Sequence, residues 1–497
     1  MNLNIVFNIK RITESEGILV DMLTNNFVIP REISERLVRE EYNPYIKSLI
    51  DGVWVFIESP YVDKVYRDSY YNYFSSKLNH NIKDCIRISL FKSEIEFNDF
   101  RNNEGINDLK DKFLGFIVIR PTPPAIIGRS VISPDAFKHY PFQNCQINVN
   151  ISVNSVKMCV NGFPHSSQDT ETITCAETVI WACLEYFGTK YSDYKTILPS
   201  QITNVLSKVA FERQLPSGGL NVLQISSALK EFGFGSKIYS AFEHKCDFPV
   251  ILSTYIESGI PLIVILHKSN GSGHAVLWMG HENFKDLDFD QLDTKKKYLN
   301  NITVYDLDCI EKKYVVIDDN YPPYQIATFD EPCKYYSNTA FHAYKVEYIV
   351  VPLYSKIYLE AFEAKKFIYD LISLSPWKMP DGISVALRFY LSSTRSFKDW
   401  VALKSEMQED LREIILSIAM PKFIWVAELG SKDSFKREKA KGIIILDATG
   451  ANRRDLKPLI IAAYSDHLFF FDSKTNEPQT PLEISLAEFS IYQNLKK

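Results

Sequence analysis

The sequence predicts an α+β protein made of about three domains, and three observations lead to this fold class. The chain has 497 residues, whereas a single domain usually has about 150. Helical and extended patterns are mixed in the first third, and the middle third begins with helices and continues as strands. The last part has two long helical patterns followed by strands, an order typical of α+β proteins. We expect the domains to span 1–156, 157–355 and 356–497.

The first segment, 1–156, combines a helix with several strands. Apolar spacing predicts a helix over 30–41, and Asn43-Pro44 ends it. Two runs rich in β-branched and aromatic residues and one alternating run predict strands at 52–58, 113–120 and 146–155.

The middle segment, 157–355, is expected to begin with helices over 175–187 and 220–232. The predicted strands that follow lie at 261–267, 274–279, 314–318 and 344–351. A polar stretch at 282–310 is rich in Asp and Lys, which favours a solvated loop between two of these strands.

The last segment, 356–497, is interpreted as a separate α+β domain without a catalytic motif. Helices are predicted over 356–374 and 397–419, with a break at 375–377 between them. The strands expected after them lie at 423–429, 442–446 and 459–471.

Composition excludes several classes of protein. Hydrophobic residues make up 46% and charged residues 24%, as in ordinary globular proteins. The 56 basic and 61 acidic side chains give a net charge of −5, so we do not expect nucleic acid as a main partner. The most apolar stretches, 261–266 and 458–463, are far shorter than the ~20 residues of a membrane span. The N-terminus has no apolar run followed by a small-residue cleavage site, so no secretory signal is expected.

Eight cysteines are scattered along the chain and form no CxxC pair. They are Cys85, Cys145, Cys159, Cys175, Cys183, Cys246, Cys309 and Cys333. This pattern favours neither a zinc site nor a disulfide framework, so we expect no metal, no cofactor and a reducing, cytoplasmic location. One of the thiols is then free to do chemistry.

Cys175 is the candidate nucleophile. The stretch TCAE at 174–177 fits a capping box, with Thr174 as the N-cap residue and Glu177 three positions later. Cys175 would then occupy the first helical position, where free backbone N–H groups and the helix dipole favour the thiolate form. Gly188 is expected to stop the helix, and Cys183 falls on its apolar stripe and is interpreted as core. The alternative is that Cys175 is also only a small apolar residue.

A thiol nucleophile needs an imidazole base and a group that orients it. His274 opens an apolar strand directly after a Gly/Ser turn, and Asp318 ends a later strand just before a turn. Asp319 is the alternative to Asp318 as the orienting carboxylate. The rival bases do not follow a glycine turn into an apolar strand; they are His244, His267 and His281.

The reaction also needs donors for the oxyanion that develops on a carbonyl oxygen. The backbone N–H of Cys175 is one candidate. The side-chain amide of Gln168, a few residues upstream, is a second.

These residues resemble those of the papain-like cysteine peptidases, in particular the bacterial peptidases that cleave double-glycine leader peptides, and the phytochelatin synthases. The matching pieces, in order, are Gln168, TCAETVIWACLEYFG at 174–188, GHAVLWMG at 273–280 and VVIDDNYPP at 315–323. The stretch GIPLIVIL at 259–266 also stands where those families have a strand. The similarity covers about 165–325, a third of the chain.

The resemblance implies a papain-like domain over 157–355, with a helix-borne Cys175 and an antiparallel sheet that carries His274 and Asp318. It also implies a peptidase that cleaves a peptide or isopeptide bond through a thioacyl-enzyme, with Gln168 near the oxyanion. A protein or peptide is the expected partner, and nothing predicts the oligomeric state. Two alternatives stay open, an acyltransferase or amidase that uses the same triad and an inactive papain-like binding module.

Overall fold

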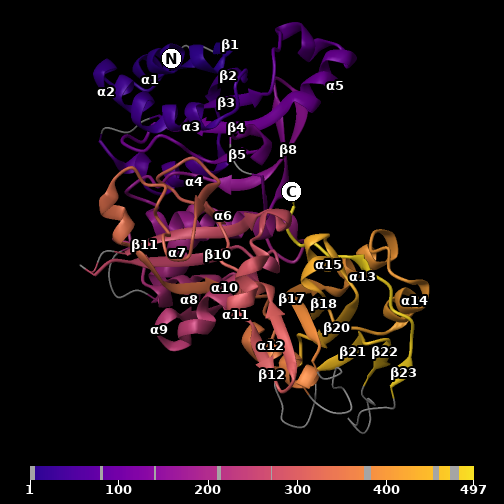
Figure 1. Cartoon of the computed structure of the whole chain (residues 1–497). Coiled ribbons are helices and arrows are strands. Elements are labelled where there is room, and N and C mark those ends of the chain that lie inside the picture. Colours follow the sequence, from indigo (N-terminus) through magenta and orange to yellow (C-terminus); the bar gives the residue numbers. More distant parts are fainter. Residues whose placement is uncertain are drawn as a thin grey trace.

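The computed structural model describes residues 6–78, 82–138, 141–209, 214–269, 271, 273–373, 382–450, 458–470 and 481–496. Helices and strands are mixed throughout these residues, so the predicted α+β class is confirmed. The described residues form three large sheets that take most of their strands from successive parts of the chain, and Figure 1 shows these parts as indigo to purple, magenta to salmon and orange to yellow.

The first sheet has the strand order β1-β2-β3-β4-β5-β8-β7, and all its strand pairs are antiparallel. Its strands are β1 (Val6–Arg11), β2 (Trp54–Tyr61), β3 (Cys85–Phe91), β4 (Phe113–Ile119), β5 (Ser130–Ile132), β7 (Ile147–Val153) and β8 (Val156–His165). The helices of this part are α1 (Ser15–Asn26), α2 (Arg31–Leu37), α3 (Asn43–Ser48), α4 (Lys64–Asn72) and α5 (Asn103–Lys112). The predicted helix at 30–41 and the three predicted strands are confirmed, but the prediction that Asn43-Pro44 ends the helix is wrong. A π-helical turn (Val38–Tyr42) follows α2 directly, and the helical backbone continues as α3 to Ser48, because a proline at the second position of α3 is compatible with a helix.

The second sheet carries the candidate site. Its order is β15-β14-β11-β10-β16-β9, its pairs are antiparallel, and β6 pairs with the far end of β11. The strands are β6 (Phe142–Asn144), β9 (Lys237–Ser240), β10 (Leu262–His267), β11 (Gly273–Glu282), β14 (Tyr314–Ile317), β15 (Gln325–Ala327) and β16 (Lys345–Val351). The helices are α6 (Cys175–Lys190), α7 (Pro199–Val209), α8 (Val222–Glu231), α9 (Ala241–His244) and α10 (Phe248–Glu257). The two helices and four strands predicted for this segment are confirmed.

Helix α6 packs against β8 and β11, and almost its whole length is buried. The prediction that Gly188 stops this helix is wrong, because α6 continues to Lys190. A Cβ atom at Gly188 would lie 2.4 Å from the backbone carbonyl carbon of Lys195. Glycine is therefore required here because a neighbouring segment approaches the helix backbone closely, and not because the helix ends.

The third sheet has the order β12-β13-β17-β18-β20-β21-β22-β23. Its strands are β12 (Lys297–Leu299), β13 (Ile302–Asp306), β17 (Ser384–Ser393), β18 (Phe423–Gly430), β20 (Gly442–Asp447), β21 (Leu459–Tyr464), β22 (His467–Phe469) and β23 (Leu482–Glu483). A separate small pair joins β19 (Lys439–Ala440) and β24 (Phe489–Ser490).

The prediction of a solvated loop at 282–310 is wrong. This stretch contains α11 (Leu292–Lys295), β12 and β13, and β13 pairs in parallel with β17 of the third sheet. Ile302 and Val304 of β13 are fully buried. Short strands among many charged residues gave a polar average that concealed their alternation.

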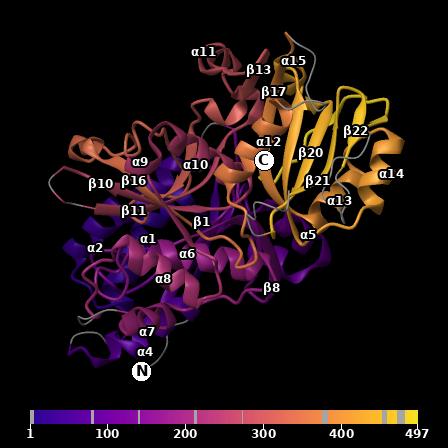
Figure 2. The ribbon, with the colours of Figure 1, turned by 90° about the horizontal axis from the view of Figure 1, so that it is seen from below.

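Helices cover both faces of the third sheet, as Figure 2 shows for the C-terminal part of the chain. Helix α12 (Ala361–Ser373) shares one apolar cluster with Phe389 and Trp425. Helices α13 (Thr394–Leu403), α14 (Glu409–Ser417) and α15 (Lys432–Lys436) pack on the opposite face with Ala386 and Tyr390. Successive residues of β17 therefore serve two different cores.

Two of the predicted elements in this part are divided. The single helix expected over 397–419 is wrong, because Glu406 between α13 and α14 has a φ of 56°, which a helix cannot include. The strand expected over 459–471 is split into β21 and β22 by Ser465 and Asp466, which both have positive φ, as in a tight hairpin turn.

The other helix and strands predicted for the C-terminal part are present, although the helix begins later than expected. The helix predicted over 356–374 begins only at Ala361, and its last residue and the expected break at 375–377 lie outside the described residues. The predicted strands at 423–429 and 442–446 are β18 and β20.

The end of the chain returns to the middle of the molecule. Lys496 forms an antiparallel bridge with Asn144, the last residue of β6. Asn494 donates hydrogen bonds to the backbone carbonyls of Glu257 (3.2 Å) and Leu391 (3.1 Å). The second and third sheets are therefore held together by the C-terminal segment. Within the described residues, none of the helices has both the length and the apolar character needed to cross a bilayer.

Candidate active site

Cys175 is the first residue of α6, as predicted, and the capping box is formed. The Glu177 carboxylate accepts hydrogen bonds from the backbone N–H of Thr174 (3.2 Å) and from its hydroxyl. Its other oxygen accepts a hydrogen bond from the hydroxyl of Ser217, in the loop before α8. Cys175 is partly exposed, whereas Cys183 is fully buried in the core, as expected for that residue.

The loop before α6 is held by a buried carboxylate. Asp169 accepts hydrogen bonds from the backbone N–H groups of Glu171 (3.0 Å), Thr172 (2.6 Å) and Ile173 (2.9 Å). The N–H of Asp169 in turn donates to the carbonyl of Ile173 (3.1 Å). This closed turn fixes the direction from which the chain enters the helix that carries Cys175.

Arg120 ties the same loop to the first sheet. It follows β4 and is 3% exposed. Its guanidinium donates to the backbone carbonyls of Ser167 (2.7 Å) and Gln168 (2.8 Å). Burial lowers the pKa of Arg120, while the negative charge of Asp169 opposes this effect. Arg120 and Asp169 could not be predicted from the sequence, because single charged residues in loops carry no motif.

His274 lies beside Cys175. It is the second residue of β11, and the Cys175 thiol acts on its imidazole and contributes to the rise of its pKa. The Nε2 atom lies 3.2 Å from Oδ1 of Asp318. The packing of α6 against β11 therefore brings the first turn of the helix next to the first residues of the strand.

The rival histidines contact other groups. His267 is near Glu347, with 3.7 Å between the ring nitrogen and the carboxylate. His281 is at the opposite end of β11 and contacts Glu257 at 2.8 Å. His244 contacts the carbonyl of Ser240 at 3.2 Å. Among the rival bases and His274, only His274 has a pKa that the Cys175 thiol is seen to raise.

Asp318 is fully buried and has a complete set of donors. Oδ1 faces His274 and accepts from the backbone N–H of Asn320 (3.0 Å). Oδ2 accepts from the hydroxyls of Tyr335 (2.6 Å) and Tyr336 (2.7 Å). Tyr336 also lies 3.3 Å from Nε2 of His274. The two tyrosines fix the carboxylate, and the adjacent letters YY in a loop gave no signal from which their role could be predicted.

The electrostatics of the pair favour an ionised state. Burial alone would lower the pKa of His274, but the Asp318 carboxylate and the hydrogen bonds to Asp318 and Cys175 raise it well above the ordinary value. Burial alone would raise the pKa of Asp318, but His274 and the donors around it hold that pKa well below the ordinary value. An imidazolium beside a carboxylate is thus the preferred state of this pair.

Asp319 lies on the same side of the imidazole but farther away. Its Oδ1 is 4.0 Å from Nε2 of His274, compared with 3.2 Å for Asp318. The choice of Asp318 as the orienting carboxylate therefore agrees with the geometry. Burial and the neighbouring charge of Asp318 raise the pKa of Asp319 to about 8.

The side chain of Gln168 is hydrogen-bonded to another loop of the site. Its side-chain amide donates to Oδ1 of Asn320 at 3.2 Å, and Asn320 belongs to the loop that carries Asp318. The hydrogen bonds of the described residues thus connect Gln168 to the carboxylate side of the site and not to Cys175. The backbone N–H of Cys175 is left as the stronger candidate for an oxyanion donor.

The same cluster has a spacing that a metal ion could use. Ligand atoms of His274, Asp318 and Asp319 lie within 4.8 Å of one another. However, Nε2 of His274 and both oxygens of Asp318 are already engaged by each other, by Asn320 and by two tyrosines. These contacts fit a hydrogen-bonded pair better than a set of ligands around an ion.

The His274–Asp318 pair is expected to make stability depend on pH. The raised pKa of His274 contributes stability that is full below about pH 6.5 and is lost as the pH rises through the value in the folded state. The depressed pKa of Asp318 contributes stability that is full above about pH 4 and is lost as the pH falls. Asp318→Asn should therefore destabilise the protein most near pH 5 and clearly less near pH 9, as measured by urea unfolding of both proteins at each pH. An equal loss at the two pH values would show that the pair is not charged.

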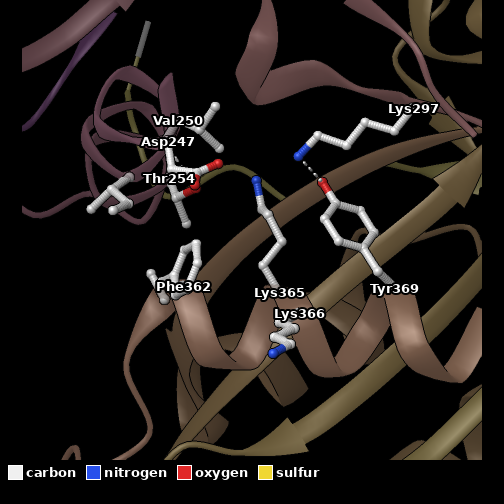
Figure 3. A pocket seen from close by; sticks show the side chains of 10 residues that line it. Asp247, Val250, Thr254, Lys297, Phe362, Lys365, Lys366 and Tyr369 are labelled. Carbon is white, nitrogen blue, oxygen red and sulfur yellow. Dashed lines mark hydrogen bonds between the residues drawn. The ribbon is translucent and has the colours of Figure 1, made fainter. Parts of the chain in front are cut away.

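A hollow elsewhere in the molecule does not involve these residues. A cavity of about 200 Å³ lies between α10 and α12, with Lys297 of β12 at its side (Figure 3). Lys297 donates to the hydroxyl of Tyr369 at 3.4 Å. Lys365 points toward the cavity, but its ammonium group is bound by the buried carboxylates of Asp306 and Asp308. The cavity therefore contributes nothing to the Cys175 site.

Comparison with known proteins adds no assignment. No protein-family model matches the chain, and a search of curated proteins finds no match.

Proposed function

We propose that the chain is a cysteine-dependent hydrolase of papain-like type that acts as a peptidase, with Cys175 as nucleophile, His274 as base and Asp318 as orienting residue. The observation that carries this proposal is that one imidazole connects the two other groups: the Cys175 thiol acts on His274, and Nε2 of His274 lies 3.2 Å from the Asp318 carboxylate. The nucleophile on the first turn of α6, the base on β11 and the carboxylate after β14 are in the order and on the elements that a papain-like domain uses.

The chemistry follows from these positions. His274 takes the thiol proton on Nδ1, and the Cys175 thiolate attacks the carbonyl carbon of a peptide or isopeptide bond. The backbone N–H of Cys175 and the positive end of α6 face the oxyanion that forms. His274 then gives the proton to the leaving amine, and a thioester remains on Cys175. Water attacks the thioester with His274 as base, which releases the acid and restores the thiol.

Asp318 keeps the imidazole in the required orientation and tautomer. With Nε2–H donated to Asp318, Nδ1 is free to exchange a proton with the thiol. The two tyrosine hydroxyls and the N–H of Asn320 hold the carboxylate so that it cannot rotate away. A reducing, cytoplasmic compartment suits such a nucleophile, because oxidation of the thiolate would end the reaction.

The test is a search for new peptide termini by mass spectrometry. The full chain and its Cys175→Ala variant are incubated with a proteome-derived peptide library, and Cys159→Ala, which removes an exposed cysteine on β8, serves as the matched control. We expect new termini with the wild type and with the control, and none with Cys175→Ala. Products joined to an added amine would indicate acyl transfer instead of hydrolysis. Identical termini with all three proteins would contradict the proposal.

A further inference from the structure

Asp319 is a buried carboxyl group without a donor. Its side chain is 1% exposed, and neither of its oxygens accepts a hydrogen bond from any donor among the described residues. A buried carboxylate with no donor is far less stable than the neutral acid, because the acid carries no charge that needs solvation. The carboxyl group therefore retains its proton under conditions in which an exposed aspartate loses it.

The neighbouring carboxylate of Asp318 is the candidate acceptor for this proton. The side chains of Asp318 and Asp319 lie close together, with one ligand atom of each within 4.8 Å of the other, and two ionised carboxylates this close repel each other. Asp318 already has donors from His274, Asn320 and the two tyrosines, so it keeps the negative charge. Asp319 then acts as the donor in the pair, as one acid does when two carboxyl groups share a site.

We propose that Asp319 is a second positioning residue of the site, which donates a hydrogen bond to Asp318 while neutral and adds a negative charge 4.0 Å from His274 when ionised. In the neutral form it fixes the carboxylate that orients the imidazole. In the ionised form it holds the imidazolium to higher pH, because two carboxylates then face the same ring nitrogen. The catalytic consequence rests on the proposed function, whereas the protonation of Asp319 does not.

Few other groups act on Asp319. The charge on His274 favours its ionisation and that on Asp318 opposes it. Tyr336 lies on the loop that covers Asp318, and Tyr45 of α3 lies on the side of the first sheet; burial raises the pKa of each hydroxyl, so both are neutral.

The side of the first sheet holds two further titratable groups. Tyr45 is hydrogen-bonded to His165 at 2.6 Å, and burial lowers the pKa of His165 to about 4, so this histidine is neutral as well. The positive charge of Arg120 acts to lower the pKa of both Tyr45 and His165. A protonation change near pH 8 in the wild type is therefore expected to come from Asp319, in contact with His274 and Asp318.

The first test reads the proton directly by infrared spectroscopy. The C=O stretching band of a protonated carboxylic acid should be present in the wild type near pH 6.5, disappear as the pH passes about 8, and be absent from Asp319→Asn at both pH values. The titration of the wild type alone already tests the claim, so it stands even if the variant folds poorly. No titrating acid band in the wild type would overturn the proposal.

The second test follows the consequence at Cys175. The rate of alkylation of Cys175 by iodoacetamide is measured on the full chain by peptide mapping between about pH 5 and pH 10. Asparagine keeps a donor toward Asp318 but cannot ionise, so Asp319→Asn should match the wild type near neutral pH. Its alkaline transition, where His274 loses its proton, should lie at least about one pH unit lower. Superimposed profiles that both show an alkaline transition would overturn the proposal, whereas a normal infrared titration together with no transition of the Cys175 rate in either protein would argue against the proposed function instead.

Discussion

Replacing His274 with alanine is expected to lower kcat/KM by roughly 10³-fold on any substrate that the search for new termini identifies. The variant loses the group that accepts the thiol proton and returns it to the leaving amine. Cys175 stays on the first turn of α6, so alkylation of the thiol at high pH should persist while turnover is lost. The measurement is the initial rate of peptide cleavage at several substrate concentrations.

His267→Ala is the matched control for this experiment. His267 lies on the neighbouring strand β10, its side chain is 43% exposed, and its partner is Glu347. We expect kcat/KM within about twofold of the wild type, because an exposed pair of this kind contributes little. Equal losses from the two substitutions, or full activity of His274→Ala, would show that the imidazole on β11 is not the base.

The largest effect on stability is expected from Arg388→Ala. Arg388 of β17 is 3% exposed and donates to Glu428 at 2.8 Å and to Glu257. Glu257 ends α10 and also contacts His281 of β11, the strand that carries His274. Alanine would leave two buried carboxylates without their main partner, which should lower the free energy of unfolding by about 3–5 kcal/mol. The measurement is urea unfolding followed by tryptophan fluorescence.

Arg437→Ala is the control for that substitution. Arg437 pairs with Glu488 at 2.8 Å, but both side chains are exposed to solvent. We expect a change of at most about 0.5 kcal/mol in the free energy of unfolding. A loss from Arg388→Ala as small as that of the control would mean that the charges between the second and third sheets do not support the fold.

The elements of the site could be predicted from the sequence because their signals are local. The capping box at 174–177 determines where α6 begins, and the apolar run after His274 determines β11. A helix and a strand each have a fixed repeat of apolar residues, so the sequence predicts that Cys175 begins a helix and that His274 begins a strand. It does not predict that the two residues meet.

The supports of the site could not be predicted, because each depends on contacts between distant segments. Tyr335 and Tyr336 act on Asp318 from a loop without regular pattern, and Arg120 reaches the loop before α6 from the first sheet. Gln168 was assigned by its distance along the chain from Cys175, but its amide is bound by Asn320, more than a hundred residues later.

The errors in the fold have the same origin. The stretch at 282–310 was judged by its average polarity, although β13 becomes buried when it pairs with β17, about eighty residues later. Gly188 was interpreted by its usual role at helix ends, whereas the close approach of Lys195 determines it. A pattern within one segment does not contain the partner that buries the segment.

The most direct test of the central claim is the competition of the eight cysteines for a limiting amount of iodoacetamide near pH 6, followed by peptide mapping. Cys159 and Cys246 are exposed, whereas Cys175 is only partly exposed, so access alone favours the other two. If Cys175 is held as a thiolate by His274 and the first turn of α6, it should be labelled at least about tenfold faster than either, and this advantage should disappear in His274→Ala. Labelling of Cys175 no faster than that of Cys159 would contradict an activated nucleophile.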